Sequence, residues 1–567
     1  MRDREPKVTE NWWKGAVTYQ VYPRSFQDAN GDGVGDLPGI ASRLSYLADL
    51  GVDAIWLSPV FPSPMKDFGY DVSDYRGIDP VFGTLRDFDA LVAGAHGLGL
   101  KVVIDQVISH SSDRHPAFAE SRSSRDGPKA DWYVWADPKR DGTPPNNWLS
   151  VFGGSAWAWD GRRRQYYFHN FLAEQPDFNF HSPEVQEFHL SNLRFWLERG
   201  VDGFRLDTVN YYFHDRLLRD NPADDRVKDR PEGNPYGMQY PLFSKNRPET
   251  PLFLERLRAL TDAYHARMML GEVGDSHHAL ALMGEYSRGA RIHQCYSFEM
   301  LGYEFTAAAF RKRIEGFQAE AKGGWPAWAF SNHDVVRHVS RWAGHGASRE
   351  ALAKLCAALL LSFEGSIYLY QGEELGQTDT ALGLDEMVDP QGIAFWPEPL
   401  GRDGCRTPMV WEAAAPNAGF STAGRTWLPV KEPQAAVAVD TQAGAAGSVL
   451  EFYRRMLSVR RSRTDLVHGA TRFLDLPEPV LGFTRGAGTL CLFNLSPASQ
   501  SLSVTGAGRL LAGEAVARGG TGLSLGPNGF ALIEAGPVVA VAPARNLSGK
   551  GGLRSCRETG GHREARP

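Results

Sequence analysis

The feature that most constrains the fold of this chain is an alternation of short apolar runs with helix-like stretches. Eight runs are rich in β-branched or aromatic residues and too short to form helices. The stretches between them have Asp or Ser near their starts and Gly at their ends, as helices do. Eight such units predict an α/β fold, a parallel (β/α)8 TIM barrel. The runs are residues 16–22, 53–58, 101–107, 201–207, 267–273, 294–300, 327–333 and 366–372, and the helical stretches include 39–51, 85–99 and 182–200.

The barrel does not use all 567 residues. Residues 109–180, after the third run, are rich in Gly, Pro, Trp and Asp and predict an inserted subdomain. The barrel is then assigned to residues 1–108 and 181–470. Short alternating runs in 471–540 predict a C-terminal antiparallel β-sandwich domain. The Gly/Arg-rich end, 541–567, has almost no apolar residues, and we expect it to be disordered.

The composition excludes several classes of protein. A net charge of -6 gives no electrostatic reason to bind nucleic acid or an anionic membrane. No apolar run reaches 18 residues and the charged N-terminus lacks a signal sequence, so we expect a cytoplasmic protein. The five cysteines are widely spaced without a CxxC motif, which predicts reduced thiols. We expect a monomer or a homodimer.

Acidic side chains stand where several of the predicted strands end. Asp207 and Glu272 close the fourth and fifth runs, and Asp334 follows the seventh. One such residue would be an ordinary solvated loop residue, but the carboxyl ends of barrel strands meet at one face. Three carboxylates converging there indicate glycoside hydrolysis, in which one attacks or stabilises the anomeric carbon and another protonates the leaving oxygen.

The neighbours of two of these carboxylates predict different protonation states. Arg205 precedes Asp207 by two residues on the same strand, so both side chains point to the same face. The guanidinium could keep Asp207 ionised, as a nucleophile requires. Glu272 lies in the apolar run "MMLGEV", where desolvation should raise its pKa, as a general acid requires.

Around these residues the chain resembles a known family. The blocks are "WWKGAVTYQVYPRSFQDANGDGVGDLPGI", "DFGYDVSDY", "DQVISHSSDRHPAF", "QPDFN", "GFRLDT", "GEVGD", "FSNHD" and "GRDGCRTPMVW", in this order within residues 12–411. They are similar to those of the α-amylase superfamily, glycoside hydrolase family 13, and within it to the bacterial α-glucosidase and oligo-1,6-glucosidase subgroup.

The resemblance implies a retaining mechanism. In it, Asp207 matches the nucleophile, Glu272 the acid/base, and Asp334 the third carboxylate, which grips the sugar and stabilises the transition state. Retention would place the carboxyl groups of Asp207 and Glu272 about 5–5.5 Å apart. The residues that match those around the first glucose are His110, Arg205 and His333.

The resemblance also implies a pocket closed at one end. Asp67 and Tyr70 match the residues that bind and stack on the terminal glucose, and Arg402 matches the arginine that pairs with Asp67. Arg406 is the alternative partner. Such a pair would make a pocket for chain ends, although a surface ion pair of little energetic weight is the other interpretation. Two aromatic residues of the insertion, Phe152 and Phe168, are predicted to form walls of this pocket, with core packing as the alternative.

Two residues depart from the commonest pattern. Ser109 stands where calcium-dependent amylases have a metal-binding Asn, so we expect no metal site at that junction. Thr208 stands where relatives that cleave α-1,6 bonds tend to have Val. The resemblance therefore favours α-1,4 bonds or short substrates such as maltose and sucrose, and a change this small is worth only ~1–3 kcal/mol of discrimination.

These observations favour a retaining, exo-acting α-glucosidase that releases α-glucose from short oligosaccharides or disaccharides. An α-glucosyltransferase or sucrose-isomerising enzyme would use the same covalent intermediate, with transglucosylation in place of hydrolysis. A non-catalytic relative, like the heavy chains of amino-acid transporters, is disfavoured because Asp207, Glu272 and Asp334 are all present.

The stretch "DANGDGVGD", residues 28–36, is written like the start of an EF-hand. Position 12 of that register is Gly39 instead of the bidentate Glu, and helical flanks are missing, so a calcium sensor is excluded. The resemblance implies a structural Ca²⁺ or Mg²⁺ here, away from the chemistry, and no cofactor for catalysis. Its predicted ligands are Asp28, Asn30, Asp32, the carbonyl of Val34, and Asp36.

Overall fold

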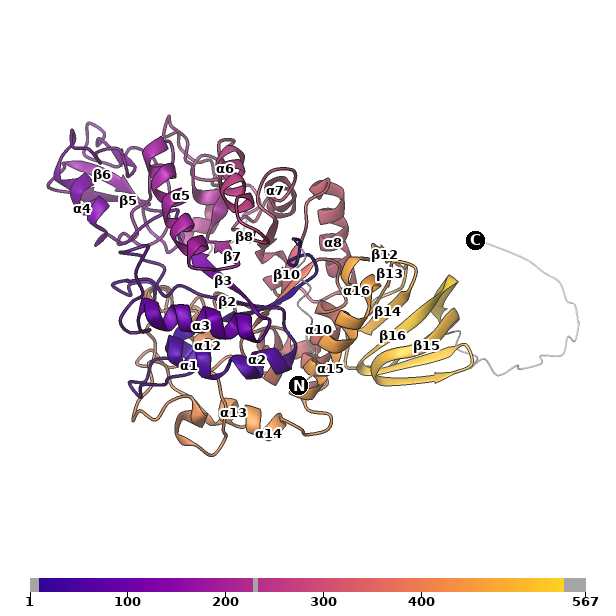
Figure 1. Ribbon diagram of the computed structural model, residues 1–567. Helices are drawn as coiled ribbons and strands as arrows, with labels where there is room; N and C mark the ends of the chain where they lie inside the picture. Colours follow the sequence, from indigo (N-terminus) through magenta and orange to yellow (C-terminus); the bar gives the residue numbers. More distant parts are fainter. Residues whose placement is uncertain (1–9, 228–232, 545–567) are drawn as a thin grey trace, which may run out of the picture.

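The computed structural model describes residues 10–227 and 233–544, and its centre is a closed barrel of eight parallel strands (Figure 1). The strand order is β10-β11-β1-β2-β3-β7-β8-β9, and a parallel bridge between Cys295 and Pro326 joins the two ends. Each predicted run forms one of these strands, so the predicted TIM barrel is confirmed. The strands are β1 Val17–Val21, β2 Ala54–Leu57, β3 Lys101–Gln106, β7 Gly203–Leu206, β8 Met268–Val273, β9 Gln294–Ser297, β10 Ala327–Ala329 and β11 Ser366–Tyr370.

Helices surround this barrel and bury their apolar faces against it. The α3 helix begins at a capping box in which Thr84 and Asp87 satisfy each other's backbone N–H groups. The stretch predicted as one helix over 39–51 forms two, since Arg43 leaves the helical conformation between them. The principal barrel helices are α1 Leu37–Ser42, α2 Leu44–Leu50, α3 Leu85–Gly97, α5 Pro183–Glu198, α6 Thr250–Asp262, α7 Ala279–Tyr286, α8 Ala307–Ala321 and α10 Arg349–Leu360.

The long segment after β3 has its own small sheet, with antiparallel strands in the order β4-β6-β5. In Figure 1 it lies to the upper left of the barrel. A bridge from His110 to Asp177 holds the end of the segment beside the residues that follow β3, and a bridge from Tyr133 to Phe178 lies within the segment. This segment therefore stands over the carboxyl ends of the strands. Its elements are α4 Pro116–Ser123, β4 Trp135–Ala136, β5 Trp157–Asp160 and β6 Gln165–Phe168.

Shorter elements carry the chain through the barrel loops and on to the C-terminal domain. The short helices are α9 His338–Arg341, α11 Pro390–Ala394, α12 Asp403–Arg406, α13 Glu432–Ala435, α14 Val439–Gln442 and α16 Thr464–His468, and α15 is longer, Val449–Ser462. The 3₁₀ turns are η1 Pro23–Ser25, η2 Val209–Tyr211, η3 Pro235–Met238, η4 Phe298–Leu301, η5 Ala343–His345, η6 Glu373–Leu375 and η7 Pro416–Gly419.

The predicted C-terminal antiparallel domain is confirmed as one five-stranded sheet, in the order β12-β13-β14-β16-β15. Two strands are far longer than expected, and Leu502 of β15 pairs with both Leu523 and Pro543 of β16, so the hairpin curls back on itself. Because β16 ends at Pro543, the sheet passes the predicted limit at 540, and most of the predicted tail lies outside the described residues. The strands are β12 Thr471–Phe473, β13 Val480–Arg485, β14 Thr489–Asn494, β15 Gln500–Gly519 and β16 Gly522–Pro543.

The structure also bears on two other expectations, which concern membrane-spanning segments and the state of the cysteines. Within residues 10–227 and 233–544, none of the helices combines the length and the apolar character that crossing a membrane requires. Cys295, Cys356, Cys405 and Cys491 are buried free thiols, as the sequence predicts, and Cys556 lies outside the described residues.

Candidate active site

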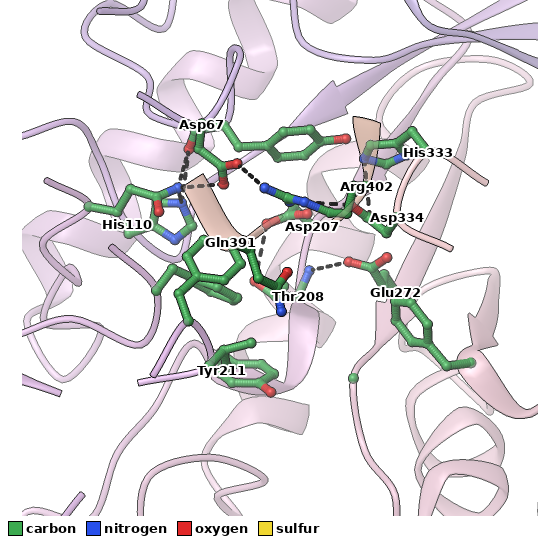
Figure 2. Close-up of a pocket in the computed structure, with 17 residues that line it drawn as sticks. Asp67, His110, Asp207, Thr208, Tyr211, Glu272, His333, Asp334, Gln391 and Arg402 are labelled. Carbon is green, nitrogen blue, oxygen red and sulfur yellow. Dashed lines mark hydrogen bonds and ion pairs between the residues drawn. The ribbon is translucent and has the colours of Figure 1, made fainter. Parts of the chain in front are cut away.

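A pocket opens where the barrel strands end and the inserted segment begins (Figure 2). It gathers residues that are far apart in the chain and come from the carboxyl ends of six barrel strands and from the insertion after β3. All three predicted catalytic carboxylates line it. The lining residues are Asp67, Tyr70, His110, Val151, Phe152, Phe171, Gln175, Asp207, Thr208, Tyr211, Glu272, Gly274, Phe298, His333, Asp334, Gln391 and Arg402.

Arg205 links the acidic groups at the base of this pocket. Its Nη1 lies 2.6 Å from Asp207 Oδ1 and 2.8 Å from Asp105 Oδ1. Its Nη2 lies 2.6 Å from Glu272 Oε1 and 3.0 Å from the hydroxyl of Tyr296. The arginine side chain is fully buried, so these partners replace the water that its two terminal nitrogens would otherwise bind, while its Nε has no hydrogen-bond partner. One guanidinium therefore fixes two predicted catalytic carboxylates side by side, and the predicted contact of Arg205 with Asp207 is confirmed.

Asp207 and Glu272 share a raised affinity for protons, as expected for Glu272, whereas the expectation that Arg205 keeps Asp207 ionised is wrong because burial outweighs the guanidinium. Burial raises the pKa of each carboxyl to about 7, against the opposing effect of Arg205. Glu272 Oε1 also accepts the Tyr296 hydroxyl at 2.5 Å, and Glu272 Oε2 accepts the backbone N–H of Thr208 at 3.3 Å. The two groups titrate as a pair, because charge on one disfavours charge on the other. Near neutral pH the pair can hold one proton, the state that one acid and one base require.

Asp334 has the opposite environment. Burial acts to raise its pKa, but His333, Arg406 and Arg402 outweigh burial and hold that pKa well below its usual range. Arg406 Nη2 lies 3.0 Å and Arg402 Nη1 3.4 Å from Asp334 Oδ1. Asp334 is therefore a permanent negative charge facing the pocket, suited to stabilise developing positive charge on a substrate.

The predicted pair between Arg402 and Asp67 is present, with 2.8 Å between Nη2 and Oδ1. The same nitrogen lies 2.7 Å from Asp389 Oδ1, and the Gln175 amide donates to Asp67 Oδ2 at 3.1 Å. The Arg402 guanidinium also lies over the Phe152 ring, 5.0 Å from its centre. Arg406, the alternative partner, binds Asp334 instead. These contacts close one end of the pocket.

Two neutral histidines complete the inner wall. Burial lowers the pKa of His110 to about 4 and that of His333 to about 3. Tyr70 stacks on His333 with ring centres 5.2 Å apart and planes 7° apart. The Gln20 amide lies 2.8 Å from His333 Nδ1, so this nitrogen accepts and Nε2, 3.2 Å from Asp334 Oδ2, carries the proton. The N–H of His333 thus lies close to the Asp334 carboxylate without a hydrogen bond to it, and both predicted histidines lie in the site.

Phe168 does not line the pocket, and its prediction as a wall residue is wrong. Its ring is 1% exposed and packs in the core of the inserted segment, 5.0 Å from Trp148 and 5.3 Å from Trp157. It is the last residue of β6, and its side chain faces the interior of that small sheet. Phe171, three residues later, lines the pocket in its place, and Phe152 lines it as predicted.

Several residues of the pocket were not predicted. Gln175 lies within the quoted block "QPDFN", which could have signalled it. Tyr211 follows the strand that carries Asp207, and its place in η2 could have been expected from that neighbour. Asp389, which binds Arg402 and does not itself line the pocket, carries no signal in the sequence. Phe298 and Gln391 also line the pocket and come from loops without a distinctive pattern.

The loop 28–36 is closed by its own hydrogen bonds. Asp28 accepts the N–H groups of Gly31 and Gly33 at 2.7 and 2.8 Å. Asp36 caps α1 by accepting the Gly39 N–H. Asp32 and Asn30 accept the backbone N–H groups of Val34 and Asp32. The oxygen donors are of the kind that Ca²⁺ and Mg²⁺ take. Within residues 10–227 and 233–544, no three Asp, Glu, His or Cys side chains are grouped so as to hold an ion, and the predicted ligands Asn30 and the Val34 carbonyl are of other kinds.

Comparisons with known proteins place this geometry in a family. Residues 20–469 match the α-amylase catalytic domain. A probable α-glucosidase of Rhizobium meliloti (strain 1021) is 56% identical over 497 residues, 86% of this chain and 90% of the relative. An oligo-1,6-glucosidase of Parageobacillus thermoglucosidasius is 35% identical over 87% of this chain and 91% of its own length.

Solved structures give the same result for the fold. The crystal structure of an α-glucosyl transfer enzyme has a TM-score of 0.89 and 52% identity, over 92% of this chain and 99% of the other. A trehalulose synthase of Pseudomonas mesoacidophila MX-45 has a TM-score of 0.83 and 33% identity, over 92% of this chain and 99% of the other.

The different places of the two phenylalanines predict different effects of their removal. Phe168→Ala leaves a cavity in a packed aromatic core, which costs about 3–5 kcal/mol and lowers the Tm in calorimetry. Phe152→Ala removes a half-buried wall ring, so its Tm should stay close to that of the wild type. Equal losses of Tm for the two variants would contradict this assignment of wall and core.

The structural ion stays a prediction, and its removal gives a direct test. An ion that binds only the folded protein raises stability in proportion to the logarithm of its concentration. In the chelated full chain, the prediction expects added Ca²⁺ or Mg²⁺ to raise the Tm, and Asp28→Asn to abolish that rise. A Tm that does not respond to millimolar Ca²⁺ or Mg²⁺ would contradict the predicted ion, and the loop would then be held by its own hydrogen bonds alone.

Proposed function

The chain belongs to the α-amylase family, glycoside hydrolase family 13, and we propose from this premise that it is a retaining, exo-acting α-glucosidase. Its proposed reaction releases α-glucose from the non-reducing end of short α-glucosides through a covalent glucosyl-enzyme. The substrate class is disaccharides and short oligosaccharides, with α-1,4 bonds favoured and sucrose as a further candidate.

One observation carries the exo-acting part of the proposal: the closure of the pocket around Arg402. This arginine is 9% exposed and pairs with Asp67 at one end of the site. Breaking a buried pair leaves an uncompensated charge, so the closure is expected to persist when substrate binds. A glucan chain cannot pass such an end, whereas a terminal glucose can sit against it with its hydroxyl groups on Asp67.

The protonation states support a reaction with one carboxylate and one carboxylic acid, and we propose that it follows the retaining course that the family resemblance implies. In the first step the Asp207 carboxylate attacks the anomeric carbon, while Glu272 gives its proton to the leaving oxygen. The bond to the leaving sugar breaks as the bond to Asp207 forms. Asp334 lines the pocket with its pKa held low, and its negative charge would stabilise an oxocarbenium-like sugar bound there. In the second step Glu272, now a base, takes a proton from water, which attacks the same carbon and regenerates Asp207.

Glucosyl transfer is a second candidate, because the solved structure with 52% identity is described as an α-glucosyl transfer enzyme. Hydrolysis and transfer share the glucosyl-enzyme and differ in what enters the acceptor side of the pocket. Figure 2 shows Tyr211 across the pocket from Asp67. A sugar acceptor stacked on Tyr211 would compete with water for the intermediate.

Product analysis by NMR tests the function directly. The substrates are maltose, isomaltose, sucrose and nitrophenyl maltosides with a free or a blocked non-reducing end. The proposal expects α-glucose as the first product, a preference for maltose over isomaltose, and no cleavage of the blocked maltoside. Release of β-glucose would contradict retention, and cleavage of the blocked substrate would contradict exo action. Transfer products that dominate at low substrate concentration would favour the transferase.

The shared proton of Asp207 and Glu272 predicts a bell-shaped dependence of kcat/KM on pH. Both pKa values are raised to about 7, so activity should be highest near neutral pH. Below the optimum a second proton neutralises Asp207, and above it Glu272 loses the proton it must donate. The measurement is kcat/KM for nitrophenyl α-glucoside across the pH range of folded protein. A profile that is flat on both sides of neutrality would contradict the pairing.

A further inference from the structure

A chain of hydrogen bonds runs from the backbone of the Asp67 loop to the proposed nucleophile. His110 Nε2 lies 2.9 Å from the Tyr70 carbonyl oxygen, and His110 Nδ1 lies 2.9 Å from Ser109 Oγ. Ser109 Oγ lies 3.1 Å from Thr208 Oγ1, which donates to Asp207 Oδ2 at 3.2 Å. Ser109 has no role in the proposed reaction so far, although it occupies a position where the sequence departs from the commonest pattern.

The direction of these bonds follows from the Tyr70 carbonyl. A carbonyl oxygen only accepts, so His110 Nε2 carries the proton. Because burial keeps the imidazole neutral near pH 7, its Nδ1 is an acceptor. The Gln175 amide, 3.2 Å from His110 Nε2, has other acceptors in Asp67 and the Tyr70 carbonyl. Ser109 therefore gives its single hydroxyl proton to His110, and toward Thr208 it can only accept.

This leaves the Thr208 hydroxyl with one proton and two acceptors, Asp207 Oδ2 and Ser109 Oγ. A charged carboxylate attracts a donor about twice as strongly as a neutral hydroxyl oxygen. In the free enzyme with Asp207 ionised, the proton therefore points to Asp207. Once the sugar is attached, the carboxylate has become an ester without a full charge, and its attraction for the proton falls.

The local backbone keeps the hydroxyl groups of Ser109 and Thr208 within hydrogen-bonding distance of each other. Thr208 adopts a left-handed conformation (φ 41°, ψ 50°), which is strained for a β-branched residue. Ser109 is 2% exposed, and its carbonyl accepts the Phe178 N–H at 3.0 Å. The hydroxyl groups thus approach from two different strand ends, and turning the Thr208 O–H bond needs no movement of either backbone.

We propose that Ser109 is a positioning residue of the reaction: it accepts the Thr208 hydroxyl proton when Asp207 gives up its charge to the glucosyl bond. The proposal rests on the proposed function. As the anomeric carbon–Asp207 bond forms and the bond to the leaving oxygen breaks, Glu272 protonates that oxygen. The Thr208 hydroxyl turns from Asp207 to Ser109, and no bond of Thr208 or Ser109 breaks. A buried donor is thereby satisfied in both states.

Several groups besides Thr208 influence the charge of Asp207, and the test must hold them constant. They come from the neighbouring strand ends and from the loops that cover them. The groups that interact electrostatically with Asp207 are Arg205, Asp105, Glu272, Asp334, Tyr70 and Tyr212. Substitutions at Ser109 and Thr208 leave all of these surrounding groups in place and do not change their formal charges.

The test is a double-mutant cycle of Ser109→Ala and Thr208→Val in the full chain, measured with nitrophenyl α-glucoside. Ser109→Ala should lower kcat/KM about threefold to tenfold, because the Thr208 proton loses its acceptor as the ester forms. The pKa of the acid limb of the kcat/KM profile should be the same in Ser109→Ala as in the wild type, because Thr208 still donates to ionised Asp207. Thr208→Val removes that donor and should move the acid-side pKa upward. With Thr208→Val already present, Ser109→Ala should lower kcat/KM clearly less than it does in the wild type, because only the loss of its hydrogen bond to His110 remains.

The cycle separates this role from a structural one. If Ser109 only supports the His110 ring, Ser109→Ala will cost the same with and without Thr208→Val, and the proposal is overturned. Ser109→Thr, which keeps the hydroxyl, should restore wild-type kcat/KM. Ser111→Ala is the matched control, since that buried hydroxyl of the same segment bonds Tyr133 and the Ser112 carbonyl outside the site.

A second measurement distinguishes this inference from the proposed function. Removal of the sugar restores the charge of Asp207, so Ser109→Ala should not slow deglucosylation in rapid-quench kinetics. A slowed deglucosylation would contradict the inference. Asp207→Asn with undiminished activity would instead overturn the nucleophile assignment and the proposed function with it.

Discussion

The buried guanidinium of Arg205 is the interaction on which the rest of the site depends. It contacts Asp105 at the end of β3, Asp207 beyond β7 and Glu272 at the end of β8, so one side chain joins three neighbouring strands. Its cost of burial is large, and only ionised partners offset it. The same charge counters the effect of burial on the two carboxyl groups of the proposed reaction. Burial, opposed by this one cation, raises the pKa of both groups to about 7.

Three parts of the chain contribute residues to the pocket. The barrel supplies the reactive carboxylates, since the ends of its parallel strands meet at one face. The inserted segment supplies walls in Phe152, Phe171 and Gln175. The loop after β11 supplies Arg402, which reaches across to Asp67. Closure at one end thus depends on two loops whose positions the barrel fixes independently.

Sequence reasoning predicted the parts of this structure that follow from periodicity and from strand ends. The eight apolar runs became strands, and Asp207, Glu272 and Asp334 converged because parallel strands bring their ends together. Sequence reasoning failed for Phe168 because side chains alternate between the two faces of β6. A single sequence does not show which of these faces lies toward the core. Asp389 was missed because its role comes only from a loop folding back onto Arg402. The long C-terminal hairpin was missed because its Gly- and Ala-rich strands lack a clear alternating pattern.

The central claim is that Asp207 forms a covalent bond to glucose while Glu272 supplies the proton. Glu272→Gln treated with α-glucosyl fluoride tests it, because fluoride leaves without an acid whereas breakdown of the intermediate still needs the missing base. Mass spectrometry of the digested protein should find one glucosyl group on the peptide that contains Asp207. Release of β-glucose with no adduct on that peptide would contradict the account.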